Sequence, residues 1–240
     1  MGKLKNIGNA LSRYQASKGF GVHSPFAFKF ILNVLDEKYE YYAYDKLQQL
    51  RINVIERTRK ENGYKPRVIS ISEAAAIFRI ANYYNPQLFL SIGSSYGVAA
   101  ASMLAVSKRS RMFLYDDNSA QNNAAAREIL SGYGDRIVQG EDLQNTISGY
   151  ITALGDNDMF VTVNNIADHD TATATALLDT AVSRRGVLIM RNIDSSRNMA
   201  RLWQHCKQAM TYGMTFGNGK TAVMVLNPKL PRQDFEIWLS

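Results

Sequence analysis

The sequence predicts an α/β protein with a doubly wound, mostly parallel sheet of seven strands. Three observations lead to this prediction. From residue 88 onward, short β-rich runs alternate with helical stretches, an order typical of parallel strands whose connecting helices cover both faces of the sheet. Near the C-terminus, the glycine-rich turn GNG joins two β-type runs, which indicates an antiparallel hairpin. Residues 1–67 carry helical patterns, so we expect a helical N-terminal extension ahead of an α/β domain over 68–240.

Three helices are expected before the first strand. Ser24 and Pro25 mark the start of one, because serine is a good N-cap and proline is favoured at the first helical position. Apolar residues at helical spacing predict a second helix over residues 45–60. The run SISEAAAIFRIANYYN, residues 70–85, predicts a third, with Ser72 as its cap and Glu73 in its first turn.

The seven strands follow in a regular order. Five runs separated by helical stretches are expected to form the parallel part: LFLSIG (88–93), MFLYDD (112–117), RIVQG (136–140), MFVTVN (159–164) and GVLIMRN (186–192). The runs TYGMTF and KTAVMVLN are expected to form the closing hairpin.

Composition narrows the class of protein. The chain has 240 residues, 46% of them hydrophobic and 20% charged, which suits one globular domain with a small addition. It has no apolar run long enough to cross a membrane, and its N-terminus lacks the apolar core of a signal peptide, so we expect a soluble cytoplasmic protein. The net charge of +7 is compatible with an RNA partner, but the basic residues are scattered, which favours a solvated surface.

The stretch LFLSIGSSYG, residues 88–97, carries the main functional signal. A buried strand there runs into a glycine-containing turn that opens a helix, the place where an open α/β fold binds its ligand. Gly93 matches the first glycine of a dinucleotide fingerprint, but Ser95 stands where the second should be, and no Gly-Lys-Ser/Thr follows. The turn therefore favours a nucleoside with a zwitterionic side chain over a diphosphate.

Acidic residues follow the next two strands. Asp116 and Asp117 end the second strand, where a carboxylate can accept hydrogen bonds from ribose hydroxyls. Glu141 and Asp142 follow the third strand, where a carboxylate could accept a hydrogen bond from an adenine amino group. Together with the glycine turn, these acids predict a site for an adenosyl ligand.

The turn, the acid after strand two and the closing hairpin resemble the class I S-adenosylmethionine-dependent methyltransferases, especially the branch like catechol O-methyltransferase. The resemblance covers about residues 68–227, and GVHSPFAF is similar to the opening of a bacterial group of such proteins. It implies a Rossmann-like fold, a helical N-terminal cover over the substrate and S-adenosylmethionine as cofactor. The resemblance implies Gly93, Ser95 and Gly97 for the methionine part of the cofactor, Asp116 or Asp117 for the ribose, and Asp142 or Glu141 for the adenine. Ser94, Tyr96 and Asn164 are further candidate cofactor-binding residues.

The sequence also departs from this family. Ser91 stands where the family usually has an acid, two residues before the first glycine. Metal-dependent members carry an Asp after strand four and an Asp-Asn pair after strand five, whereas this chain has Asn164 and then Arg191-Asn192. Magnesium prefers oxygen ligands that include carboxylates, so we expect no catalytic metal.

The resemblance implies methyl transfer, with O-methylation of a small molecule as the first reading. No residue stands out as the general base, and His169 and His23 are the candidates. The main alternative is a catalytically degenerate fold that binds a nucleoside or a protein. An RNA methyltransferase is less favoured because no RNA-binding signature is visible, and a homodimer is left open.

Overall fold

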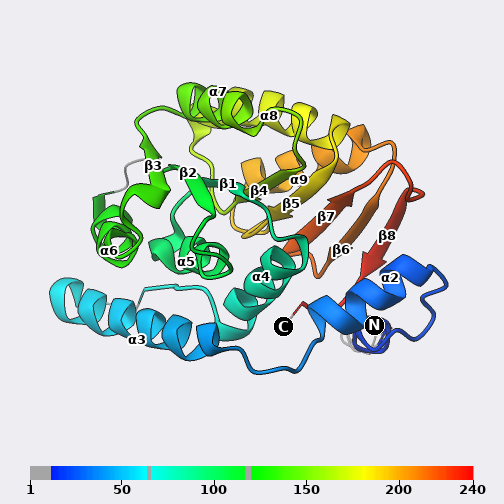
Figure 1. The fold of residues 1–240 in the computed structure, drawn as a ribbon, viewed down its shortest axis with the longest axis horizontal. Helices are drawn as coiled ribbons and strands as arrows, with labels where there is room; N and C mark the ends of the chain where they lie inside the picture. The colour runs from blue at the N-terminus through cyan, green and yellow to red at the C-terminus, as the bar shows by residue number, and fades with distance from the viewer. Residues whose placement is uncertain (1–11, 64–65, 117–119, 240) are drawn as a thin grey trace.

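Eight strands in the described part of the chain form one sheet. The computed structural model describes residues 12–63, 66–116 and 120–239, without the side chains of 62, 95 and 120–125. The strand order is β3-β2-β1-β4-β5-β7-β6-β8 (Figure 1). The strands are β1 Leu88–Ile92, β2 Arg111–Tyr115, β3 Ile137–Gly140, β4 Met159–Val163, β5 Gly186–Met190, β6 Met214–Gly217, β7 Ala222–Leu226 and β8 Gln233–Glu236.

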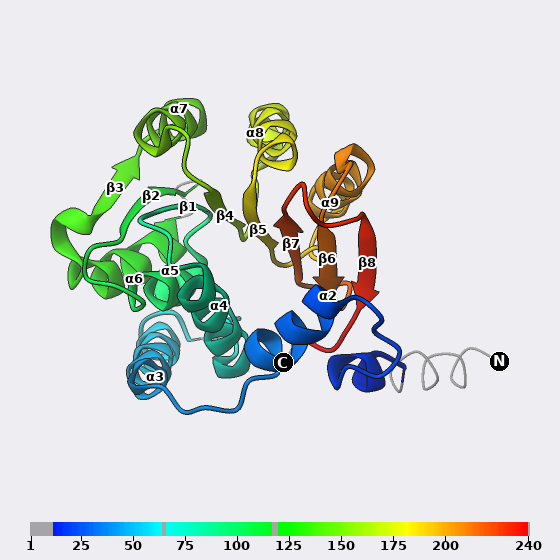
Figure 2. The same ribbon diagram turned by 45° about the vertical axis from the view of Figure 1, so that its right-hand side comes forward.

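Helices cover both faces of this sheet, which confirms the doubly wound prediction. α4, α5 and α6 lie on one face and α7, α8 and α9 on the other (Figures 1 and 2). The main helices are α2 Pro25–Phe30, continued by the π-helical turn η1 Ile31–Leu35, α3 Tyr42–Asn62, α4 Ile71–Tyr84, α5 Val98–Leu104, α6 Ala120–Ser131, α7 Leu143–Leu154, α8 Thr171–Ser183 and α9 Arg197–Ala209. Short 3₁₀ turns are η2 Ser95–Gly97, η3 Gly134–Arg136 and η4 Asp168–Asp170.

The strand directions follow the prediction, with one addition. β3, β2, β1, β4 and β5 are parallel, β7 is antiparallel to β5, and β6 and β7 form the expected hairpin. β8 is an eighth strand, parallel to β6 at the edge of the sheet. Its sequence QDFE has no apolar alternation because three of its four residues are exposed, which is why the sequence did not reveal it.

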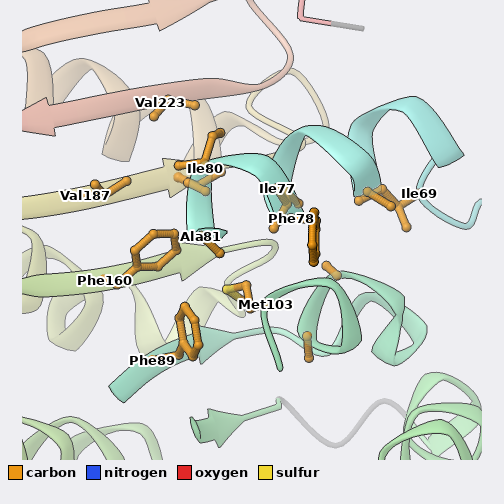
Figure 3. Packing of buried hydrophobic residues seen from close by; sticks show 14 of the residues in the cluster. Ile69, Ile77, Phe78, Ile80, Ala81, Phe89, Met103, Phe160, Val187 and Val223 are labelled. Atoms are coloured by element: carbon orange, nitrogen blue, oxygen red, sulfur yellow. The ribbon is translucent and has the colours of Figure 1, made fainter. Parts of the chain in front are cut away.

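The larger hydrophobic core lies between α4, α5 and the sheet (Figure 3). Ile77, Ile80 and Ala81 of α4 point toward the strands that carry Phe160 and Val187. All five residues are nearly or fully buried. Burial of this apolar surface is the main force that holds the helix layer against the sheet.

The N-terminal helices share this core. The Phe30 ring lies 5.0 Å from that of Phe216 in β6. Arg79 of α4 donates hydrogen bonds to the carbonyl oxygens of Val34 and Leu35, each at 2.7 Å, and so closes the end of η1. The expected boundary near residue 67 falls in the segment between α3 and α4.

The predicted helix starts were right in one case and displaced in another. The Ser24 hydroxyl accepts a hydrogen bond from the Ala27 amide, and Pro25 is the first helical residue, as expected. α4 is capped by Ser70, whose hydroxyl accepts from the Glu73 amide at 3.2 Å. Ser72 was the wrong cap, because the helix begins one residue before it.

Candidate functional site

The carboxyl ends of β1, β2, β3 and β4 meet at one edge of the sheet. The chain winds outward in opposite directions from β1 and β4, which are neighbours in the sheet. Such a reversal leaves a crevice above the strand ends, which is where open α/β sheets bind ligands. The glycine turn after β1 and the acids after β2 and β3 all lie at this edge.

The turn after β1 has an unusual backbone. Gly93, Tyr96 and Gly97 all have positive φ angles, of 80°, 61° and 78°. A positive φ strains a tyrosine and is easy for glycine. A Cβ atom on Gly97 would lie 3.2 Å from the Cα of Ala126, so this glycine lets α6 pack closely against the turn. Ser95 lies between these residues in η2.

Asp116 and Ser94 hold the turn against the end of β2. The Ser94 amide donates a hydrogen bond to Oδ2 of Asp116 at 3.2 Å, and Asp116 is 6% exposed. Ser94 is 2% exposed, and its hydroxyl has no hydrogen-bond partner within the described part of the chain. A buried hydroxyl without a partner is costly, and a polar ligand would remove that cost.

Ser94 and Asp116 open onto a hollow of about 560 Å³. Its lining comes from the turn, the ends of β2 and β3, and α6: Ser94, Leu114, Asp116, Ala126, Arg127, Leu130, Ile137, Gln139, Gly140 and Glu141. The volume lies in the range of small-molecule sites, and the lining mixes apolar walls with a few polar groups.

The two acids after β3 have different places. Glu141 is exposed and lines the hollow. Asp142 is the N-cap of α7, where its Oδ1 accepts from the Asn145 amide at 2.8 Å. The capping role accounts for Asp142, whereas Glu141 is the acid that lines the hollow.

Asn164 joins the turn to the neighbouring strand ends. Its side-chain amide donates to the carbonyl oxygen of Gly93 at 2.7 Å and lies 3.4 Å from the Ser91 hydroxyl. Ser91, fully buried in β1, accepts a hydrogen bond from the Thr162 hydroxyl at 3.1 Å. The serine therefore forms part of a neutral hydrogen-bonded layer beneath the turn.

A buried ion pair continues this layer toward β5. Arg191 directly follows β5 and is 3% exposed at its side chain. Its Nη1 donates to the Asn164 side-chain oxygen at 2.8 Å, and its Nε donates to Oε1 of Glu73 at 3.0 Å. The Thr221 hydroxyl donates to the same carboxylate oxygen at 2.6 Å. The side chains thus connect β1, β4, β5, β7 and α4.

The charge of Arg191 sets the protonation of Glu73. Burial would by itself raise the pKa of the Glu73 carboxyl, but the attraction and hydrogen bond of Arg191 lower this pKa below its usual value of 4.5. Glu73 is therefore a carboxylate at neutral pH and neutralises Arg191.

These residues do not fit a divalent metal. The side-chain oxygen of Asn164 is occupied by the Arg191 guanidinium, whose positive charge repels a second cation. Across residues 12–63, 66–116 and 120–239, no group of three acidic, histidine or cysteine side chains could hold an ion.

The histidine candidates lie apart from the hollow. His169, in η4 after β4, is 74% exposed and has its Nε2 3.5 Å from Oδ2 of Asp170. The same Asp170 oxygen accepts a hydrogen bond from Tyr115 of β2 at 2.6 Å. His23 is exposed beside Ser24, whose hydroxyl contacts Met214 at the start of β6, the opposite edge of the sheet from the strand ends described above. The structure therefore does not bring His23 to the other candidates.

Some site residues were missed in the sequence, and one cannot be placed. Asp117 lies outside the described residues. The contribution of α6 to the hollow and the Glu73–Arg191 pair were not predicted, because residues 73 and 191 are far apart in the chain. The available signals were an acid in the first turn of a helix and an arginine at the end of an otherwise apolar strand.

The described ranges contain no helix that is both long and apolar enough to span a bilayer. No protein-family model and no curated protein sequence matches this chain.

Several solved structures share the fold. An O-methyltransferase from Bacillus cereus in complex with SAH is 14% identical, with a TM-score of 0.53 over 83% of this chain and 96% of that one. TomG, an O-methyltransferase from Streptomyces achromogenes in complex with SAM, is 14% identical, with a TM-score of 0.51 over 79% and 92%. A methyltransferase from Geobacter sulfurreducens is 18% identical, with a TM-score of 0.52 over 79% and 90%. The chain has the Rossmann-like α/β fold of these proteins.

Proposed function

We propose that this protein is an S-adenosylmethionine-dependent methyltransferase that methylates an oxygen atom of a small molecule without a metal ion. The observation that carries the proposal is the buried Ser94 hydroxyl without a partner, beside the Asp116 carboxylate at the crevice of the sheet. The shared fold supports it, because two of the similar structures hold SAM or SAH.

In this proposal, different residues contact different parts of the cofactor. Asp116 would accept hydrogen bonds from the ribose hydroxyls, with Asp117 as the neighbouring alternative, and Glu141 would lie beside the adenine. The backbone from Gly93 to Gly97, including Ser95 and Tyr96, would hold the methionine part, with the Ser94 hydroxyl as a further donor. Asn164 would act through the turn, because it holds the Gly93 carbonyl, and Asp142 through the start of α7.

The chemistry needs little from the side chains. When bound, the cofactor supplies a methyl group already activated by a positively charged sulfur. The acceptor oxygen would form a bond to the methyl carbon as the carbon–sulfur bond breaks, with the electron pair going to sulfur and the hydroxyl proton to water. The protein's contribution is to align the acceptor and exclude other nucleophiles. Arg191 and Glu73 neutralise each other, and the Arg191 charge beside Asn164 disfavours a divalent cation at this edge.

Calorimetric titration with S-adenosylmethionine tests the proposal. We expect micromolar binding by the wild-type protein. Asp116→Asn and Ser94→Ala should each weaken it about tenfold or more, because each removes one buried polar partner. Asp135→Asn, an exposed carboxylate in η3, is the matched control and should bind normally. A protein that is folded but does not bind at millimolar ligand would contradict the proposal.

Binding and catalysis need separate readouts. If the cofactor binds, a screen of hydroxylated small molecules by mass spectrometry should find a methylated product. Cofactor binding without any methylated product across such a screen would favour the catalytically degenerate scaffold instead.

A further inference from the structure

A second hollow lies at the same edge of the sheet, next to Arg191. It has a volume of about 270 Å³. The segment leading into α4, the start of α4, the residues after β5, the β6–β7 turn and the end of the chain line it: Arg67, Val68, Ile69, Ser70, Glu73, Arg191, Asn192, Asp194, Asn218, Lys220, Thr221 and Leu239.

The charged residues of this second hollow are unbalanced. Three are cationic, Arg67, Arg191 and Lys220, and two are carboxylates, Glu73 and Asp194. Arg191 and Glu73 pair with each other in the floor. Arg67 and Lys220 are exposed. The charge of Arg67 helps to lower the pKa of the Glu73 carboxyl, but no salt bridge joins Arg67 or Lys220 to a residue in the described ranges. Two accessible cations therefore face one exposed carboxylate, and the opening of the hollow favours an anion.

One part of the hollow is apolar. Val68 and Leu239 are partly buried and pack against the larger hydrophobic core, and Ile69 is almost fully buried beside them. A carbon skeleton can rest on these side chains while a charged group remains near the cations. The lining is mainly polar, and this small apolar part is the feature that a small organic acid would contact and a simple inorganic ion would not.

Hydrogen bonds link residues of the second hollow to the turn after β1. Arg191, which lines it, donates to Asn164, and Asn164 donates to the carbonyl oxygen of Gly93. Asn192, which also lines it, donates to the Asn164 backbone carbonyl at 2.9 Å. One buried asparagine therefore contacts both the turn after β1 and two residues that line the second hollow.

We propose that the second hollow binds the methyl acceptor, and that this acceptor is a small hydroxylated carboxylic acid whose carboxylate is held by Arg67 and Lys220. The inference rests on the proposed function, since it names the substrate class for that site. The carboxylate would accept charge-assisted hydrogen bonds from the two cations, and the carbon skeleton would lie on Val68 and Leu239. Asp194 at the opening would disfavour acids with several negative charges.

A pair of probes of equal shape tests this inference. We would titrate the protein with 4-hydroxybenzoate and with its neutral analogue 4-hydroxybenzamide, following protein chemical shifts by NMR, with and without saturating SAH. We expect the acid to bind more tightly than the amide. Lys220→Met and Arg67→Met should each weaken acid binding about three- to tenfold and leave amide binding unchanged.

Matched controls remove the same charges elsewhere. Lys229→Met and Arg109→Met alter exposed cations outside the second hollow and should leave acid binding unchanged. Equal binding of acid and amide, or equal effects of Lys220→Met and Lys229→Met, would overturn the inference.

The same samples distinguish the two proposals. SAH binding without acid binding would overturn the substrate class and leave the methyltransferase proposal standing. Acid binding that depends on Lys220, in a protein that binds no SAH, would support the anion site and count against the proposed function.

Discussion

Replacing Glu73 with alanine should destabilise the protein strongly. The substitution removes the charge that neutralises Arg191, whose side chain is 3% exposed, and it leaves the Thr221 hydroxyl without its acceptor. Removing one partner of a buried ion pair costs about 3–5 kcal/mol. Because the Glu73 side chain is 24% exposed, water can partly replace it, and we expect the lower end, about 3 kcal/mol.

This loss is large enough for thermal unfolding to resolve. For a domain of this size, about 3 kcal/mol corresponds to a fall in Tm of about 6–12 °C. Differential scanning calorimetry at pH 7 would measure it. Glu236→Ala is the control, because Glu236 forms an exposed pair with Arg13 at 2.9 Å, worth about 1 kcal/mol or less. If Glu73→Ala lowers Tm no more than Glu236→Ala, the buried network does not hold the strand ends together as described.

Four further outcomes are expected. The pKa of the Glu73 carboxyl is lower in the folded protein than its usual value of 4.5, so the ionised carboxylate stabilises the fold above that value and this stabilisation is lost as pH falls through the lowered pKa. The unfolding free energies of wild type and Glu73→Gln should therefore converge in acid. A constant difference from neutral to strongly acidic pH would refute this. Gly97→Ala should lower stability by about 1–3 kcal/mol in urea unfolding, since the residue has φ 78° and α6 packs against it; an unchanged midpoint would show that the turn relaxes. Tyr150→Phe removes the hydroxyl that accepts from the Phe160 amide at 2.9 Å, and a loss of about 1–3 kcal/mol is expected, with a neutral result arguing against that bond. Burial raises the pKa of the Cys206 thiol to about 12, so a disulfide reagent at pH 8 should label this thiol only after the protein unfolds. Fast labelling of the native protein would contradict the burial of Cys206.

The sequence revealed the parallel part of the fold because its signals are local. Each buried strand is a short apolar run, and each is followed by a helical stretch, so order and direction follow from the connections. β8 was not predicted because its signal is not local. Gln233–Glu236 is a polar edge strand that pairs with β6. The same limit explains the π-helical turn after α2, whose end is held by the distant Arg79.

The position of the candidate site could be predicted from the sequence, but the role of each residue in it could not. The glycine turn and Asp116 follow strands, so their meeting at one edge could be expected from the topology. The choice between Glu141 and Asp142 could not, because it depends on which carboxylate caps α7. The partner of Arg191 comes from a helix more than a hundred residues earlier in the chain, and no local pattern links the two.

The proposed function requires an adenosyl cofactor in the hollow lined by Ser94 and Asp116, between the turn after β1, the ends of β2 and β3, and α6. A crystal structure of the protein with SAH would show whether the cofactor lies there. We expect the ribose against Asp116, the adenine beside Glu141 and a polar atom of the ligand within hydrogen-bond distance of the Ser94 hydroxyl. Ordered SAH elsewhere, with Ser94 and Asp116 untouched, would contradict it.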